Sequence, residues 1–265
     1  MAYTLITGAS SGIGEGFAKE YARRGHNLIL SARSEEKLTH LARQLAGERN
    51  VDVRIVVQDL SEPDGAEKIY DFCQKNRLDI ELLINNAGVG IAGEFSSHPL
   101  GRIERMMTLN MLALVKLTHL VLPEMRKRNG GGIINVASTA AFQSVPYLGV
   151  YSATKAFVLS FSEALNEELK ETGIKVMALC PGGTDTAFFD TAEYNRAKFM
   201  LPLDTTENVV RAAIDGFRQG RSVVICGVLN NVQTFLVRFF PRNLVTKIAG
   251  GFLKSDPSGD SSRLE

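Results

Sequence analysis

The stretch Tyr3-Thr4-Leu5-Ile6-Thr7-Gly8-Ala9-Ser10-Ser11-Gly12-Ile13-Gly14 decides the fold class. Its first five residues are β-prone, glycines punctuate the next seven, and a helical pattern then runs to about Arg24. Glycines let the backbone turn tightly and approach a pyrophosphate, and a helix N-terminus offers free N–H groups to the phosphates. We interpret this turn as a dinucleotide phosphate site formed by Gly8, Ser10, Ser11, Gly12, Ile13 and Gly14. The alternative, an ordinary glycine-rich turn, is disfavoured because the motif follows the first strand directly.

The second predicted strand indicates which dinucleotide is bound. It covers residues 26–31 and is followed by Ala32 and Arg33. An NAD site commonly has an acidic residue at this place, on the ribose 2′-hydroxyl. Arg33 would instead bind a 2′-phosphate through charge-assisted hydrogen bonds. An arginine at 33, with no acidic residue at 32, therefore predicts NADP(H) rather than NAD. The alternative is that the Arg33 side chain only faces solvent.

Strand-like and helix-like segments alternate along the chain, and several strands are continuously apolar, as in Leu82-Leu83-Ile84. Such strands are covered on both faces. The sequence therefore predicts an α/β Rossmann fold, a doubly wound, seven-stranded parallel sheet with helices on both faces. Ligands of this architecture bind beyond the carboxyl ends of the strands, where the glycine turn, Ser138 and Pro181-Gly182 would meet. The predicted strands are residues 3–7, 26–31, 51–57, 80–84, 131–138, 174–180 and 222–226.

Tyr151 and Lys155 form the candidate catalytic pair, with Ser138 thirteen positions upstream of the tyrosine. Residues four apart on a helix share one face. A nearby ammonium favours the phenolate, so we expect Lys155 to lower the pKa of Tyr151 and make it a general acid or base. The pair alone is weak evidence, because a tyrosine and a lysine at this spacing often lie on a solvated helix face.

Three segments divide the chain. We expect a Rossmann domain with a built-in catalytic site at 1–227, a C-terminal helical cap at 228–255 and a disordered tail at 256–265. The cap has apolar residues at helical spacing with interleaved arginines and lysines. It would pack over the substrate cleft or a partner subunit, or it would lie on an anionic membrane surface as a basic amphipathic segment.

Composition excludes several classes of function. The net charge of +1 argues against a nucleic-acid partner. Three unpatterned cysteines fit reduced thiols in a cytoplasmic protein. There is no uninterrupted run of eighteen apolar residues, so we expect no membrane-spanning helix, and no signal peptide is recognised before the first strand. The four histidines show no metal-ligand spacing, so no metal site is expected.

Over residues 3–227 the chain resembles the short-chain dehydrogenase/reductase superfamily, in particular its NADP-preferring bacterial members. The motifs that carry the resemblance are Thr7–Gly14, Asn85-Asn86-Ala87-Gly88, Asn110, Ser138, Tyr151 with Lys155, and Pro181-Gly182, in the family's order and spacing. The resemblance implies a catalytic tetrad of Asn110, Ser138, Tyr151 and Lys155. It also implies homo-oligomers formed through the helices around Asn110 and Tyr151.

The resemblance also implies the cofactor contacts. Asp59 and Leu60 would lie beside the adenine, and Asn86, Ala87 and Gly88 along the ribose side. Ser10 would assist Arg33 at the 2′-phosphate, and Lys155 would bind the nicotinamide ribose next to Tyr151. The remaining contacts, to the nicotinamide amide and the phosphates, would come from Pro181, Gly182, Thr184 and Thr186.

The expected activity is NADP(H)-dependent interconversion of a hydrophobic ketone or aldehyde and its alcohol. Apolar residues between Ser138 and Tyr151, together with aromatic residues in 188–199, suggest an apolar substrate pocket. Two alternatives stay open: an NAD-dependent alcohol dehydrogenase, and a non-catalytic dinucleotide sensor with a membrane- or partner-binding tail. The sequence does not select the substrate, the direction of the reaction, or a dimer over a tetramer.

Overall fold

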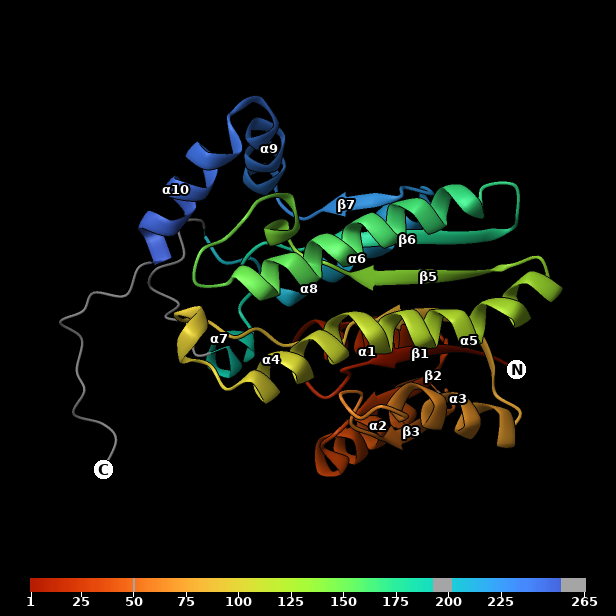
Figure 1. The fold of residues 1–265 in the computed structure, drawn as a ribbon. Helices are drawn as coiled ribbons and strands as arrows, with labels where there is room; N and C mark the ends of the chain where they lie inside the picture. The colour runs from red at the N-terminus through yellow and green to blue at the C-terminus, as the bar shows by residue number, and fades with distance from the viewer. Residues whose placement is uncertain (50, 193–201, 254–265) are drawn as a thin grey trace, which may run out of the picture.

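A computed structural model describes residues 1–49, 51–192 and 202–253 of the chain (Figure 1). Within these residues, seven strands form one parallel sheet of order β3-β2-β1-β4-β5-β6-β7. This is the doubly wound order predicted from the sequence, with the first crossover reversal beside β1. The strands are β1 (Ala2–Thr7), β2 (Asn27–Ala32), β3 (Val53–Val57), β4 (Asp79–Asn85), β5 (Gly131–Val136), β6 (Ile174–Cys180) and β7 (Val223–Ile225).

The helices that frame the sheet and its rim vary widely in length. They are α1 (Gly12–Arg23), α2 (Glu35–Arg49), α3 (Gly65–Lys75), α4 (Leu100–Met107), α5 (Ala113–Lys127), α6 (Gly149–Glu168), α7 (Phe188–Thr191), α8 (Thr206–Arg218), α9 (Val228–Leu236) and α10 (Arg242–Leu253). Short 3-10 turns cover Phe95–Ser97, Thr139–Phe142 and Val237–Phe239.

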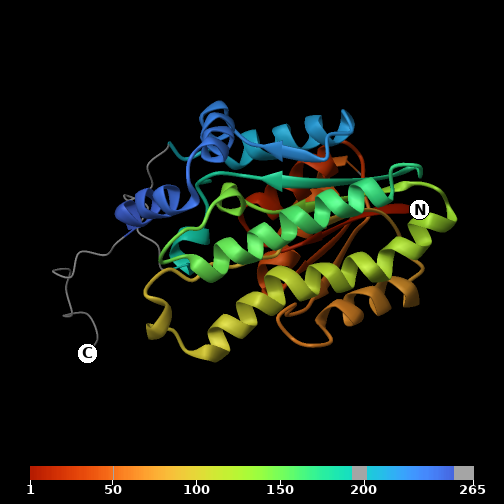
Figure 2. The same cartoon turned by 45° about the horizontal axis from the view of Figure 1, so that its top comes forward.

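The continuously apolar strands are explained by two separate cores, one on each face of the sheet. In β2, Leu28 and Leu30 belong to the core beneath α1, α2 and α8, whereas Ile29 between them belongs to the core beneath α3, α5 and α6. Successive strand residues point to opposite faces, so a strand covered on both sides must be apolar at every position. The two helix layers lie on opposite sides of the sheet in Figures 1 and 2.

One helical run is long and apolar. Residues Leu100–Lys127 have a mean hydropathy of 1.4 over their most apolar window, which meets the length and composition of a membrane-spanning helix. The expectation that no helix spans a membrane stays a prediction, because core helices of globular domains meet the same criterion. Leu117, Val121 and Met125 of the run are buried against the sheet, so its apolar side forms part of the core.

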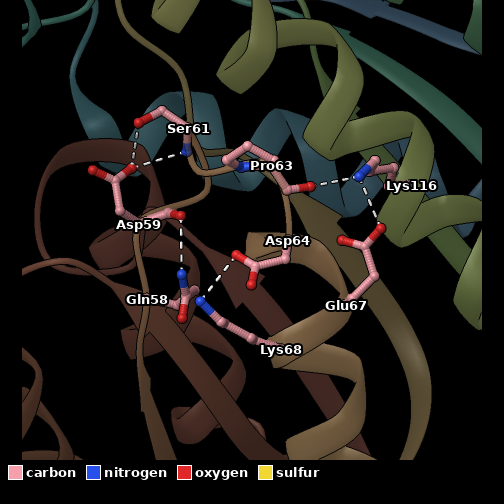
Figure 3. A network of polar contacts seen from close by, with 8 residues as sticks. All are labelled: Gln58, Asp59, Ser61, Pro63, Asp64, Glu67, Lys68 and Lys116. Atoms are coloured by element: carbon pink, nitrogen blue, oxygen red, sulfur yellow. Dashed lines mark hydrogen bonds and ion pairs between the residues drawn. The ribbon is translucent and has the colours of Figure 1, made fainter.

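The loop between β3 and α3 is held by a contact with α5. The Lys116 ammonium on α5 donates to the Pro63 carbonyl and pairs with Glu67 of α3 (Figure 3). Gly65 is the first helical residue, and a Cβ there would lie 2.5 Å from the Asp59 carbonyl oxygen. The chain thus turns tightly at 59–64 before the helix, and this turn holds the Asp59 loop beside the carboxyl ends of the strands.

The helices α9 and α10 lie beyond the carboxyl ends of β5, β6 and β7, at one end of the molecule (Figure 2). The sequence analysis expected a helical cap in this region. The division into a domain at 1–227 and a cap at 228–255 stays a prediction, and the tail predicted at 256–265 lies outside the described residues.

Candidate active site

A cavity of about 900 Å³ lies at the carboxyl ends of the strands. It receives residues from each motif that the sequence analysis singled out. Of the predicted site residues, those that line it are Gly8, Ser10, Ser11, Gly12, Ile13, Arg33, Asp59, Leu60, Asn86, Ala87, Gly88, Ser138, Tyr151, Lys155, Pro181, Gly182, Thr184 and Thr186. Gly14 and Asn110 do not line the cavity but lie directly behind it.

The glycine turn between β1 and α1 is held open by backbone geometry that other residues would not adopt. Gly8 and Gly12 have positive φ angles of 65° and 56°. The Asn86 amide donates to the Thr7 and Gly8 carbonyl oxygens at 2.9 and 3.2 Å, which fixes the turn from the side of β4. The result is a concave strip of small residues at the N-terminus of α1, and it fits the pyrophosphate of a dinucleotide.

Gly14 supports this turn from behind. A Cβ there would lie 2.3 Å from the Gly8 carbonyl oxygen and 2.5 Å from the Asn86 Nδ2 atom. We therefore expect Gly14→Ala to lower the free energy of unfolding by about 1–3 kcal/mol, because backbone must move to admit the methyl group. Urea unfolding measures this change, and NADPH fluorescence titration should show weakened cofactor binding.

Gly47 in α2 is the matched control, since it is also helical and a Cβ there would meet nothing within 4 Å. Gly47→Ala should raise the free energy of unfolding by up to about 1 kcal/mol, because alanine is the better helix former. If Gly14→Ala and Gly47→Ala had the same free energy of unfolding and the same NADPH affinity, the small size of Gly14 would not be what this turn requires.

The adenosine end of the cavity carries two cations. Arg33 follows β2, its side chain is 69% exposed, and its Nη1 atom lies 3.9 Å from Asp59 Oδ2. Asp59 Oδ1 also accepts from the Ser61 backbone and hydroxyl, which orients the carboxylate (Figure 3). Lys37, in the first turn of α2, also lines the cavity, and the sequence analysis missed it. A second cation four residues after Arg33 was the available signal.

At the opposite end of the cavity, Ser138 meets Tyr151 and Lys155 of α6. Ser138 lies two residues after β5, at the N-cap of the 3-10 turn Thr139–Phe142. Tyr151 and Lys155 are 8% and 5% exposed, and the Lys155 ammonium lies 5.8 Å from the centroid of the Tyr151 ring. Lys155 Nζ donates to the Val136 carbonyl oxygen at 2.8 Å. The Ser138 side chain lies close enough to the Tyr151 phenol to affect its pKa. A carbonyl oxygen placed between Ser138 and Tyr151 would thus meet two hydroxyl groups.

Burial controls the protonation of this pair. It raises the pKa of Tyr151 to about 12, although the Ser138 side chain opposes the shift. It lowers the pKa of Lys155 to about 8. The expectation that Lys155 would lower the pKa of Tyr151 is therefore wrong for this structure, because taking both groups out of water disfavours the charged form of each. Near neutral pH, Tyr151 is an uncharged phenol beside an ammonium.

Asn110 lies at the centre of a π-helical segment, Thr108–Leu112, between α4 and α5. It is 1% exposed, and both polar atoms of its side chain have hydrogen-bond partners. Its Oδ1 atom accepts from the Val89 N–H, and its Nδ2 atom donates to the Val89 carbonyl and to the Thr154 hydroxyl. A single-turn π segment interrupts the regular hydrogen-bond ladder and often marks a functional site. Asn110 therefore joins the cofactor loop after β4 to the helix that carries Tyr151.

The wall beside Tyr151 is mainly apolar and aromatic. The Phe188 ring of α7 lies 5.4 Å from the Tyr151 ring, centroid to centroid. Ala140, Val145 and Leu148 supply further apolar wall. The sequence analysis missed several lining residues, Gln143, Asn230, Gln233, Thr234 and Ala249, because four of them belong to the terminal helices. Of the predicted aromatic stretch at 188–199, residues 193–199 lie outside the described part of the chain.

The described residues contain no group of three or more His, Cys, Asp or Glu side chains placed to hold a metal ion. The three cysteines are free and buried, and burial raises the pKa of each thiol to about 12. These thiols are therefore inert at neutral pH. The chemistry that this cavity supports comes from its hydroxyl groups and its one buried ammonium.

Comparisons with known proteins agree with this geometry. Residues 2–197 match the family model described as short chain dehydrogenase. The very-long-chain 3-oxoacyl-CoA reductase of Rattus norvegicus is 34% identical over 262 residues, which is 96% of this chain and 80% of that protein.

Two solved structures are similar over most of the chain. A short-chain dehydrogenase from Sphingobium yanoikuyae in complex with NADPH has a TM-score of 0.82 and 33% identity, covering 100% of both chains. The bulky-bulky ketone specific alcohol dehydrogenase from Comamonas testosteroni has a TM-score of 0.76 and 31% identity, covering 91% of this chain and 96% of that one.

Proposed function

The chain belongs to the short-chain dehydrogenase family, and from that premise we propose that it is an NADP(H)-dependent reductase of hydrophobic ketones or aldehydes. Family membership makes it an oxidoreductase that acts on CH–OH or C=O groups with NAD(P). The observation that carries the finer proposal is the Ser138–Tyr151 pair, which lies in one cavity with both the glycine turn and the apolar wall.

The dinucleotide would lie along the cavity from Arg33 to Tyr151, and its nicotinamide would supply the hydride. Ser138 donates a hydrogen bond that orients and polarises the substrate carbonyl. Tyr151 delivers a proton to the carbonyl oxygen as hydride arrives at the carbon. Lys155 stabilises the phenolate left behind and binds the nicotinamide ribose hydroxyls, and Asn110 holds a water that returns a proton to Lys155. The remaining contacts with the cofactor are those implied by the family resemblance.

The protonation state of Tyr151 suits it to the role of an acid. A phenol with a pKa of about 12 holds its proton throughout the physiological range, so Tyr151 is ready to donate one. Alcohol oxidation would need the phenolate as a base, which burial disfavours. Carbonyl reduction is therefore the direction in which Tyr151 enters the reaction in its prevailing form, whereas the net direction follows the redox equilibrium and the ratio of reduced to oxidised cofactor.

The substrate we propose is a ketone with long or bulky apolar substituents. The wall formed by Ala140, Val145, Leu148 and Phe188 offers no fixed charge to clamp a carboxylate. The names of two relatives both denote action on a ketone group but on different substrates, since one refers to very-long-chain 3-oxoacyl-CoA, a thioester, and the other to bulky ketones. The test is NADPH oxidation with aliphatic 3-oxoacyl thioesters and bulky aryl ketones, against short keto acids as controls. Turnover of the keto acids alone would contradict the proposal.

Arg33 is proposed to select NADPH over NADH. Arg33→Ala should weaken NADPH binding by roughly tenfold to a hundredfold and leave NADH binding nearly unchanged, because hydrogen bonds to charged groups contribute about 1.5–3 kcal/mol. Fluorescence titration with both cofactors measures the ratio. Arg54→Ala is the control, since Arg54 is similarly exposed and pairs with Asp52 away from the cavity. If the ratio of NADPH affinity to NADH affinity were unchanged in Arg33→Ala, Arg33 would not select the cofactor.

We further propose a homo-oligomer in the cytoplasm. Large apolar side chains are exposed on the layer formed by α4, the π-helical segment Thr108–Leu112 and α6, where Leu100, Leu112 and Phe157 are 67%, 53% and 40% exposed. This face fits a second copy of the chain, and the family resemblance implies the same helices. Reduced, buried cysteines support a reducing compartment. Static light scattering of the NADPH-saturated protein would give the number of subunits.

A further inference from the structure

The helix α9 has its polar side toward the protein and its apolar side toward solvent. Thr234 is buried, and its hydroxyl donates to the Asn230 carbonyl within the helix. Asn230 also faces inward, where its amide donates to the Cys226 carbonyl. The large apolar residues point outward instead, namely Val228, Leu229, Val232, Phe235 and Leu236. A surface helix in water normally has the opposite arrangement.

The exposed apolar residues continue across the following turn and α10. Phe235 and Phe239 form an edge-to-face pair with ring centroids 5.1 Å apart, so α9 and the 3-10 turn that follows it share one surface. We define the C-terminal apolar surface as Val228, Leu229, Val232, Phe235, Leu236, Phe239, Phe240, Leu244 and Ile248, with exposures between 42% and 79%. Contiguous exposed apolar residues of this kind mark a site that binds a partner or a membrane.

The charges around this surface have one sign. Arg238, Arg242 and Lys247 are exposed among the apolar residues, and residues 228–253 contain no aspartate or glutamate. Within the described part of the chain, none of these three cations forms an ion pair. A second copy bound at this surface would bring cations against cations, whereas anionic lipid headgroups complement them. The combination of basic side chains with exposed phenylalanine and leucine is typical of helices that lie in a membrane interface.

The same two helices form part of the cavity wall on their inner side. Asn230 and Gln233 of α9 and Ala249 of α10 line the cavity. The helix α10 also contacts the loop before Tyr151, since a Cβ on Gly250 would lie 3.0 Å from Pro146 Cγ. In Figure 2 both helices project beyond the carboxyl ends of the strands. The C-terminal apolar surface therefore lies next to the proposed substrate pocket.

We propose that α9 and α10 dock this protein onto an anionic lipid bilayer through the C-terminal apolar surface. The phenylalanines enter the boundary between headgroups and acyl chains, while Arg238, Arg242 and Lys247 contact anionic headgroups. An apolar carbonyl compound dissolved in the bilayer would then reach the cavity along the inner side of the same helices. This delivery step rests on the proposed function, whereas the docking does not.

Vesicle co-sedimentation of the full chain tests the docking without reference to turnover. One vesicle population is phosphatidylcholine, and the other is an equal mixture of phosphatidylcholine and phosphatidylglycerol. We expect binding to the mixed vesicles that weakens as salt screens the charges. The double variant Phe235→Ser/Phe239→Ser should bind at least about a hundredfold more weakly, because each buried phenylalanine contributes roughly tenfold or more. Arg238→Gln/Arg242→Gln should bind about 25-fold more weakly to mixed vesicles only, at about fivefold per cation.

Val57→Ser is the matched control, since Val57 is about as exposed as Leu244 but ends β3, at the opposite edge of the sheet from β7 and the helices that follow it. It should bind like the unsubstituted chain. Circular dichroism and NADPH titration establish that each variant is folded. If the phenylalanine variant does not fold, the arginine variant and the salt series test the docking. Three results overturn the proposal: no binding to mixed vesicles, equal binding by all variants, or loss of a dimer in light scattering of the phenylalanine variant without any vesicle binding.

Discussion

Tyr151→Phe is expected to reduce carbonyl turnover by about 10²–10⁴-fold, the range that general acid–base catalysis contributes. The substitution removes a single oxygen and keeps the ring against Phe188, so the shape of the cavity should not change. Ser138 would still bind the carbonyl oxygen, but no phenol would supply a proton to it. The measurement is the kcat for NADPH oxidation with an apolar ketone.

Tyr147→Phe is the matched control for this experiment. Tyr147 lies four residues earlier on the loop before α6 and does not line the cavity. It should retain turnover, and both variants should bind NADPH like the unsubstituted chain. A Tyr151→Phe protein that keeps more than a tenth of the turnover would show that another group or water protonates the product, and the assignment of Tyr151 as the acid would fail.

The sequence was sufficient to predict the fold because its local patterns determine where strands begin, where they end and where the chain turns. The glycine turn after β1, the continuously apolar strands and the motif at 85–88 each fix where the chain turns, and strand order follows from the connection rules of α/β sheets. The same signals bring Ser138, Tyr151 and the glycine turn to one rim. Residue spacing therefore predicts which groups meet, because regular elements place their residues at known positions.

Residue spacing does not show how deeply a side chain is buried or which face of a helix points to solvent. The four-residue spacing placed Lys155 beside Tyr151, but the direction of their pKa shifts depends on how completely α6 and the β5 strand exclude water. Similarly, the apolar spacing of 228–253 predicted helices without indicating that Thr234, rather than Phe235, faces the protein. Both properties are set by tertiary packing of distant segments, which a local pattern does not contain.

The pH dependence of carbonyl reduction should report on Lys155. A lysine is charged below its pKa, so with a pKa of about 8 the ammonium is fully present below pH 7 and is lost as the pH rises through 8. Tyr151, with a pKa of about 12, stays protonated over this interval and contributes no change. The kcat/KM for the ketone should therefore be constant below about pH 7 and fall about tenfold per pH unit well above 8, since this parameter reports ionisations of the free enzyme.

Two substitutions separate the charge of Lys155 from its shape. Lys155→Met should lower kcat by about 10²–10³-fold below pH 7, the cost typical of removing one preorganised group that stabilises developing negative charge. This deficit should shrink above pH 8, where the unsubstituted chain loses the same charge. Lys155→Arg should have a lower maximal rate, because its planar group cannot reproduce the bond to the Val136 carbonyl, but its profile should stay flat past pH 8 since a guanidinium does not deprotonate. Lys175→Met, at an exposed position of β6, is the control for loss of a lysine. If the kcat/KM of Lys155→Arg fell at the same pH as that of the unsubstituted chain, the ionisation would belong to another group. The ammonium of Lys155 would then not be what lets Tyr151 act as the acid.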